Sequence, residues 1–267
     1  MHKFDRFLPA RVTGALWAAL TTLLLCQPAH AQMFEPKAAF ADTKLYFTAP
    51  LRWDRTDWLY FGSTMAAIAV AHEFDGNVRK HFVADPAAAI GTTDPQGTRD
   101  ALPMLALAAG TLASAALVHS KDGYYETGTM LEAGILTAAS TTLFKYALGR
   151  ERPHETLQVD SWFANGDSFP SGHTSLAFAL GTVFAESGSD RYRWIRRGIG
   201  YGAAGLTAYW RVKGNAHWTS DVVAGAALGF TTAQFVMDRR DHTHRQVTTS
   251  VVPVDGGLAL AFSLPLN

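Results

Sequence analysis

The sequence has a single cysteine in 267 residues, Cys26, and it lies close to the N-terminus. Residues 1–31 are typical of a secretory signal peptide: a basic start, an apolar stretch over residues 12–25, and Ala29-His30-Ala31 as a small-x-small cleavage pattern. Cleavage there would remove Cys26 and leave Gln32 as the mature N-terminus. We therefore expect an exported chain without disulfides or thiol chemistry. The alternative is an uncleaved membrane anchor.

The sequence also lacks an excess of charge of either sign. Lys and Arg together number 23, Asp and Glu together number 23, and charged residues make up 17% of the chain. A nucleic-acid-binding protein would usually have a basic bias, so this class is disfavoured. The remaining length suits one domain with a full core, and we expect a single domain over residues 32–267.

Long hydrophobic runs are scarce. A membrane span needs about 20 apolar residues, and only residues 101–118 approach that length without charge. The 129–148 segment contains Glu132 and Lys145, and the segments 172–185 and 199–210 are short. This pattern favours a periplasmic domain and leaves its association with a membrane open. The alternative is an inner-membrane protein with its active site facing the periplasm, because the basic segments 191–197 and 239–245 would suit cytoplasmic loops.

The periodicity predicts an all-α helical bundle with a core of about residues 57–240. Helices are expected over residues 58–71, 101–118, 129–148, 172–185, 199–210 and 217–237. Residues 32–56 look extended, and residues 76–100 and 154–169 are predicted loops. A small C-terminal β-hairpin is expected over about residues 246–265, around Asp255-Gly256, packing on the helices or pairing with residues 44–48.

Three polar clusters interrupt the apolar segments, where unpaired charge is costly. The first contains Lys145 and Arg152, with six residues between them at the end of a predicted helix, followed by Pro153. Both cations could converge on one oxyanion, the Arg as a planar fork and the Lys as a point charge. Taken alone, this pattern is better explained by positive charge at a helix end.

The second cluster is Pro170-Ser171-Gly172-His173 at the start of a predicted helix. Free backbone N–H groups and the helix dipole make such a start an anion site. The Ser171 hydroxyl adds a donor, Gly172 lets the backbone approach closely, and His173 projects into the same place. A lone Ser-Gly-His would more often be an ordinary helix cap.

The third cluster places His217 and Asp221 four residues apart, on one helix face, with Arg211 preceding them. Asp221 can hold one imidazole nitrogen and leave the other free to act as base or nucleophile. The residues alone do not decide whether His173 or His217 attacks. By contrast, His72-Glu73-Phe74-Asp75 lacks metal-site spacing and is interpreted as a polar helix end.

Together, the three clusters resemble the motifs of the type 2 phosphatidic acid phosphatase superfamily, which includes bacterial class A acid phosphatases and vanadium haloperoxidases. Lys145…Arg152-Pro153, Pro170-Ser171-Gly172-His173 and Arg211…His217…Asp221 fit the family's order and spacing over about residues 100–237. Trp210 stands where the family usually has Ser, which puts one hydrogen bond in doubt.

The resemblance implies a phosphohydrolase that needs no metal or other cofactor. In that family pattern His217 would attack phosphorus, Asp221 would orient it, and His173 would protonate the leaving oxygen. The phosphoryl oxygens would be bound by five groups: Lys145, Arg152, Ser171, Gly172 and Arg211. The substrate would be a phosphorylated small molecule or lipid: lipid phosphates, isoprenoid diphosphates or soluble phosphomonoesters.

Two rival functions remain from the sequence. A vanadate-dependent haloperoxidase would use the same residues to hold vanadate, although the chain is short for that class. A non-enzymatic exported scaffold would give no reason for six charged or titratable residues at these spacings. Trp162 and Phe163 near the second cluster could contact an apolar substrate group or pack in the core.

Overall fold

The computed structural model describes residues 36–92, 97–118, 120–187, 190–244, 248–254 and 257–263. The predicted signal peptide, residues 1–31, lies outside the described residues. The elements run in the order α2 (Pro36–Phe47), η3 (Ala49–Arg52), α3 (Arg55–Phe82), α4 (Gly97–Leu117), α5 (Lys121–Leu148), α6 (Gly172–Glu186), η4 (Asp190–Tyr192), α7 (Arg193–Lys213), α8 (Thr219–His244), β1 (Thr248–Val254) and β2 (Gly257–Ser263).

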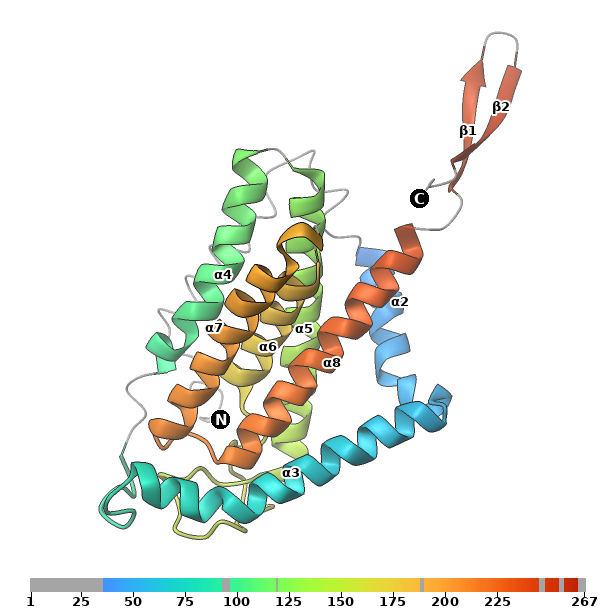
Figure 1. Ribbon diagram of the computed structural model, residues 1–267. Helices are drawn as coiled ribbons and strands as arrows, with labels where there is room; N and C mark the ends of the chain where they lie inside the picture. The colour runs from blue at the N-terminus through green and yellow to red at the C-terminus, as the bar shows by residue number, and fades with distance from the viewer. Residues whose placement is uncertain are drawn as a thin grey trace, which may run out of the picture.

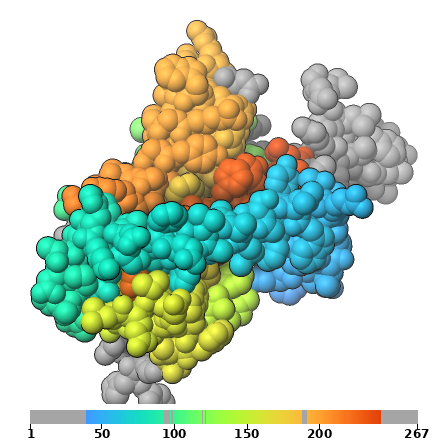
Figure 2. All heavy atoms as spheres, turned by 60° about the horizontal axis from the view of Figure 1, so that its bottom comes forward, coloured from blue at the N-terminus to red at the C-terminus, as the bar shows by residue number. Residues whose placement is uncertain are grey.

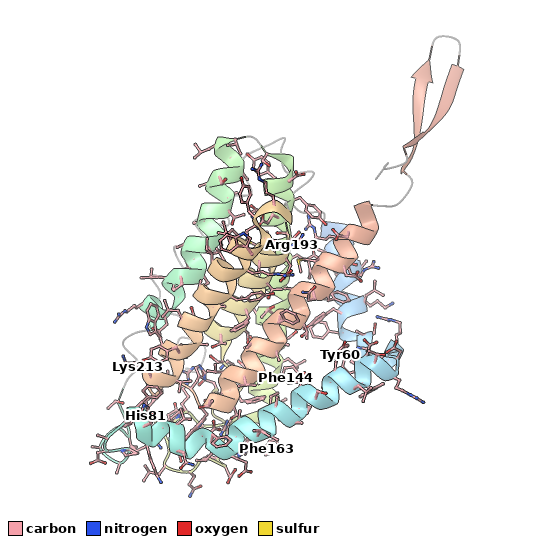
Figure 3. The ribbon with its side chains drawn as sticks, viewed as in Figure 1. Tyr60, His81, Phe144, Phe163, Arg193 and Lys213 are labelled. Carbon is pink, nitrogen blue, oxygen red and sulfur yellow. The ribbon has the colours of Figure 1, made fainter. Side chains whose placement is uncertain are left out.

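Helices α4 to α8 run roughly side by side, and α3 lies across one end of the bundle (Figure 1). The predicted all-α bundle is confirmed. Seen from that end, α3 adjoins the segment that connects α5 to α6 (Figure 2). Phe163 and Lys213 lie at this end of the molecule, whereas Arg193 lies toward the other end (Figure 3).

Helix α6 lies at the centre of the bundle and contacts its neighbours through small residues. A Cβ added to Gly229 of α8 would lie 2.0 Å from the Ser175 carbonyl oxygen of α6. A Cβ added to Gly200 of α7 would lie 2.5 Å from the Gly181 carbonyl oxygen of α6. Only glycine permits these approaches of helix backbones. These glycines therefore allow α7 and α8, which carry polar clusters, to pack closely on α6.

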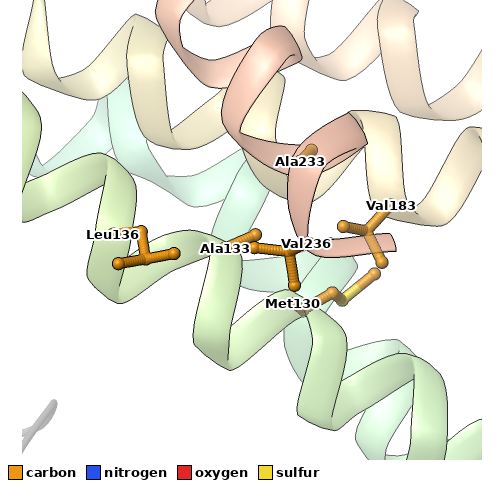
Figure 4. Packing of buried hydrophobic residues seen from close by; sticks show 6 residues of the cluster. All are labelled: Met130, Ala133, Leu136, Val183, Ala233 and Val236. Atoms are coloured by element: carbon orange, nitrogen blue, oxygen red, sulfur yellow. The ribbon is translucent and has the colours of Figure 1, made fainter. Parts of the chain in front are cut away.

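Apolar side chains of α5, α6 and α8 form the principal core (Figure 4). Its buried members are Met130, Ala133, Leu136, Val183, Ala233 and Val236. A second cluster joins α4 to α6 and α7 through Ala101, Met104, Ala177 and Ala204. Together, the two clusters pack α5, α6, α7 and α8 against one another, which positions the ends of these helices.

Several predicted boundaries are wrong. The extended-looking N-terminal region is mostly helix α2, so residues 44–48 provide no strand for the hairpin. Helix α3 continues to Phe82 through a region expected to be a loop, because Asp75 and Arg79 are buried in polar contacts with distant residues. Helix α5 begins at Lys121, eight residues before the predicted start at residue 129, and the Ser120 hydroxyl caps its first turn.

Strands β1 and β2 pair antiparallel, with Thr248 opposite Ser263 and Val254 opposite Gly257. The predicted turn residues, 255–256, lie outside the described part of the chain, as do the side chains of both strands. One described helix segment, Arg99–Leu117, is long and apolar enough to cross a membrane by length and composition.

Candidate active site

The ends of four helices bring the three clusters together at the end of the bundle crossed by α3. Lys145 lies in the last turn of α5, Gly172 starts α6, Arg211 lies in the last turn of α7, and Asp221 lies in the first turn of α8. The Ser171 amide donates to the Asp221 carbonyl oxygen at 3.0 Å, which joins the second cluster to the third. A Cβ on Gly172 would lie 3.9 Å from Lys145 Cε, so the first cluster adjoins the second.

His217 is buried at the centre of this arrangement. It lies in the turn before α8, where its amide donates to the Arg211 carbonyl oxygen at 3.2 Å. Its side chain is 1% exposed, and Nδ1 lies 3.4 Å from Asp221 Oδ2. Because a carboxylate only accepts hydrogen bonds, this geometry favours the proton on Nδ1 and leaves the lone pair on Nε2.

The surroundings of His217 keep its imidazole neutral. Burial lowers the pKa of His217 well below its usual value, and nearby positive charges lower it further. These charges belong to Arg152, Arg211, Lys145 and His173. A neutral imidazole has a lone pair available for attack, so the arrangement suits a nucleophile or a base.

Asp221 is held by contacts on both carboxylate oxygens. Oδ1 accepts from Arg150 at 2.7 Å, while Oδ2 accepts from the Trp218 amide at 2.9 Å and from the Ser168 hydroxyl. Burial raises the pKa of Asp221, and Arg150, Ser168 and Trp218 oppose that effect. Oδ2, the oxygen facing His217, therefore has a fixed direction.

The first-cluster cations are both held by Asp167. Arg152 donates from Nε to Oδ1 at 2.7 Å and from a terminal nitrogen to Oδ2 at 3.1 Å, a forked pair. Lys145 Nζ donates to the Asp167 backbone oxygen. Burial, together with the charge of Arg152, lowers the pKa of Lys145 to about 8.

Arg211 is held by a carboxylate from a different helix. It is buried, and it donates to Asp100 Oδ2 of α4 at 2.9 Å. The Asp100 backbone oxygen accepts from the Thr207 hydroxyl of α7 at 3.1 Å. Trp210, which replaces the serine usual in this motif, lies against the Arg99 guanidinium, with 5.3 Å from Cζ to the ring centroid.

The start of α6 matches the predicted anion site in part. Ser171 is the N-cap residue, but its hydroxyl lies 3.0 Å from the Thr174 hydroxyl and caps no backbone N–H. The first-turn N–H groups of a helix have no partner within it, and here they adjoin Lys145. His173 is less buried than His217.

The structure thus brings together all eight residues predicted for the site. They are Lys145, Arg152, Ser171, Gly172, His173, Arg211, His217 and Asp221. Among the described residues, no group of three or more His, Cys, Asp or Glu side chains is suited to hold a metal ion.

Sequence reasoning missed the residues that hold this set in place. Asp100 and Asp167 hold the cations, Ser168 and Arg150 hold Asp221, and Asp75 of α3 holds Arg150. The interpretation of residues 72–75 as a polar helix end is wrong for Asp75, which is 1% exposed. The available signal was a carboxylate four residues beyond the predicted apolar helix of residues 58–71.

Comparison with known proteins finds similarity over the segment that carries the three clusters. Residues 127–244 match the family model described as the PAP2 superfamily. A curated relative, lipid A 1-phosphatase of Porphyromonas gingivalis, is 38% identical over 102 residues, which is 38% of this chain and 20% of that protein. No solved structure matches.

Two further relatives are named non-specific acid phosphatase. The Salmonella typhi protein is 32% identical and the Salmonella typhimurium protein 34% identical, each over 108 residues. Each alignment covers 40% of this chain and 38% of the relative. The chain therefore spans about a fifth to two fifths of the length of the curated relatives it matches.

Proposed function

Because residues 127–244 form a PAP2 superfamily domain, we propose that this protein is a phosphohydrolase that works without a metal and forms a phosphohistidine intermediate. The observation that carries the proposal is the state of His217. It is buried, Asp221 Oδ2 lies 3.4 Å from its Nδ1, and burial together with nearby positive charges lowers its pKa well below the usual value. A phosphate group is the ligand that suits three fixed cations beside such an imidazole.

In the first step, the Nε2 lone pair of His217 attacks phosphorus, and a P–N bond forms as the bond from phosphorus to the leaving oxygen breaks. His173 gives a proton to the leaving oxygen. Lys145, Arg152 and Arg211, with the N–H groups at the start of α6, bind the three non-bridging oxygens and stabilise their charge. Asp221 stabilises the positive charge that develops on His217.

In the second step, a water molecule attacks the phosphohistidine. His173, now neutral, takes a proton from that water, the P–N bond breaks, and its electron pair returns to Nε2. Inorganic phosphate leaves, and both histidines regain their starting protonation states. Proton transfer by a positioned side chain of this kind contributes about 10²- to 10⁴-fold in rate.

We propose lipid or isoprenoid phosphates as the foremost substrate class, and a periplasmic or membrane location. One relative is named lipid A 1-phosphatase, and α3, which lies across the site end, exposes large apolar side chains along its length. Those exposed by more than half are Trp58, Leu59, Tyr60, Val70 and Phe74. Exposed aromatic residues such as Trp58, Tyr60 and Phe74 suit the boundary between water and a bilayer.

Helices α3 and α4 contribute side chains to the site end, which favours a single domain that extends beyond the matched segment 127–244. Asp75 and Asp100 precede that segment, yet each holds an arginine of the site end. We propose that the helical region from α3 to α8 acts as a single phosphatase domain. The signal peptide over residues 1–31 stays a prediction, and sequencing the mature N-terminus tests it.

Hydrolysis is expected to survive removal of divalent metals. Three cationic side chains already neutralise the phosphate, so no metal is needed to offset its charge. Purified protein should hydrolyse nitrophenyl phosphate equally well before and after EDTA treatment, and vanadate should inhibit it. Activity lost in EDTA and restored by a divalent ion would contradict the proposal. Bromination with vanadate, peroxide and bromide would instead favour the haloperoxidase.

Substrate affinity is expected to fall as the pH rises through about 8, where Lys145 loses its proton. The protonated form, present below that pKa, binds phosphate, so the KM for nitrophenyl phosphate should increase on the alkaline side. Lys145→Arg should move this increase to higher pH, because guanidinium stays charged there. A KM that is independent of pH across this range in the unaltered protein would contradict the role of Lys145.

A further inference from the structure

Arg150 is a buried arginine of the site end with no role in the steps above. It is fully buried and contacts two buried carboxylates. One terminal nitrogen donates to Asp221 Oδ1 and to the Ser220 hydroxyl, both at 2.7 Å. The other donates to Asp75 Oδ2 at 2.8 Å and to the Val159 backbone oxygen at 2.9 Å. Protein acceptors thus occupy both ends of its fork.

Aromatic rings close off the rest of the Arg150 guanidinium. Its Cζ lies 4.5 Å from the ring centroid of Trp162 and 5.2 Å from that of Trp218. Such cation–π contacts are stronger when the cation is shielded from water. Arg150 is therefore oriented toward Asp75 and Asp221, whereas the charges of Arg152 and Arg211 are among those that lower the pKa of His217.

Asp75 holds a second part of the same structure, the start of α8. Its Oδ1 accepts from the Ser220 amide at 2.8 Å, and its Oδ2 accepts from the Ser220 hydroxyl. The first N–H groups of a helix lack partners within the helix, and a carboxylate there also suits the helix dipole. Asp75 of α3 thus caps the helix that carries Asp221.

We propose that Arg150 and Asp75 are positioning residues for the phosphoryl transfer. Arg150 holds Asp221 Oδ1, so that Oδ2 stays directed at His217 Nδ1, and Asp75 fixes both Arg150 and the first turn of α8. In this way α3, which lies outside the matched family segment, sets the orientation and tautomer of the proposed nucleophile. This inference rests on the proposed function of His217.

The charges around Asp221 give the two residues opposite effects. Arg150 offsets the charge of Asp221, whereas the carboxylate of Asp75 raises the pKa of Asp221. Losing Arg150 should favour protonation of Asp221, and losing the Asp75 charge should disfavour it. The charged or titratable groups that surround Asp221 and His217 are His72 and Asp75 of α3, Lys145 of α5, Arg150, Arg152, His173 of α6 and Arg211 of α7.

The test compares Arg150→Lys, Arg150→Met and Asp75→Asn in the full chain. Arg150→Lys keeps the charge without the fork, and it should lower kcat on nitrophenyl phosphate by about 10²-fold with little change in KM or vanadate inhibition. The acid limb of the kcat profile should follow the protonation of Asp221, because only the carboxylate can hold the proton on His217 Nδ1. Arg150→Met should therefore move this limb to higher pH, and Asp75→Asn should move it to lower pH. A general loss of stability would not produce shifts of opposite sign.

Asp42→Asn is the matched control. Asp42 is also a buried carboxylate paired with an arginine, Arg239 of α8 at 3.0 Å, away from the site end. This variant should leave kcat and the pH profile unchanged. If Arg150→Met fails to fold by circular dichroism, Arg150→Lys and Asp75→Asn carry the test. An increase in KM and weaker vanadate inhibition at unchanged kcat in Arg150→Lys would make Arg150 a phosphate ligand and overturn the proposal.

The ¹⁵N shifts of the His217 ring provide a readout that needs no activity, assigned by comparison with His217→Gln. Nδ1 should be protonated in the unaltered protein, and Arg150→Lys should populate both tautomers. A protein inactive on every phosphate, with this tautomer change present, would refute the proposed function and support the positioning role. Unchanged ring shifts and an unchanged acid limb in the folded variants would overturn the positioning role.

Discussion

His217→Ala is expected to abolish hydrolysis of every phosphate substrate. The variant lacks the imidazole that attacks phosphorus, and the other groups acting on that position are cations or the partly exposed His173. Better leaving groups should not rescue it, because no P–N bond can form in either case. Initial rates on nitrophenyl phosphate and on an alkyl phosphate, each compared with the unaltered protein, measure the effect.

The control for this variant is His81→Ala, which removes an exposed histidine near the end of α3. It should keep full activity on both substrates. Circular dichroism should show that both variants remain helical. If folded His217→Ala retained a substantial part of the rate on either substrate, His217 would not be the nucleophile.

His173→Ala is expected to lose activity according to the leaving group. Removing a general acid costs about 10²- to 10⁴-fold when the leaving oxygen needs a proton. An alkoxide needs that proton, whereas nitrophenolate is a weak base and needs it much less. The variant should therefore lose far more activity on an alkyl phosphate than on nitrophenyl phosphate, measured as kcat/KM for both.

A matched comparison is Asp221→Asn, which keeps the His217 imidazole but removes the carboxylate that faces Nδ1. It should be slower on both substrates by similar factors, because attack is impaired whatever group leaves. Equal losses on the two substrates in His173→Ala would contradict its role as the acid and leave it a binding or structural residue.

The spacing of the three clusters was enough to select residues that the structure brings together, because each cluster depends on local geometry. Asp221 lies four residues after His217, and Ser171-Gly172 begins a helix whatever the rest of the chain does. The proximity of the clusters to one another was expected from the family resemblance, because no local sequence pattern places residue 145 near residue 217. The predicted helices from residue 101 onward also correspond to observed helices, although α4, α5, α7 and α8 are longer than predicted.

The positioning contacts could not be predicted in this way. Arg150 and Asp75 are 75 residues apart, and Arg211 and Asp100 are 111 residues apart. Each pairing depends on how α3 and α4 pack on the bundle, which no short pattern encodes. Tertiary contacts of the same kind extend α3 beyond the predicted helix end, because buried Arg79 donates to the Asn215 side chain at 3.2 Å.

The most direct test of the central claim is to trap the covalent intermediate. The protein is mixed with a substrate carrying labelled phosphate, quenched rapidly, and digested under alkaline conditions that preserve phosphohistidine. In the unaltered protein we expect the label on the peptide that contains His217, in a form stable to base and labile to acid. The label should be absent in His217→Ala and present in His173→Ala. Label retained in His217→Ala and lost in His173→Ala would reverse the two roles, and no label in the active protein would contradict a phosphohistidine mechanism.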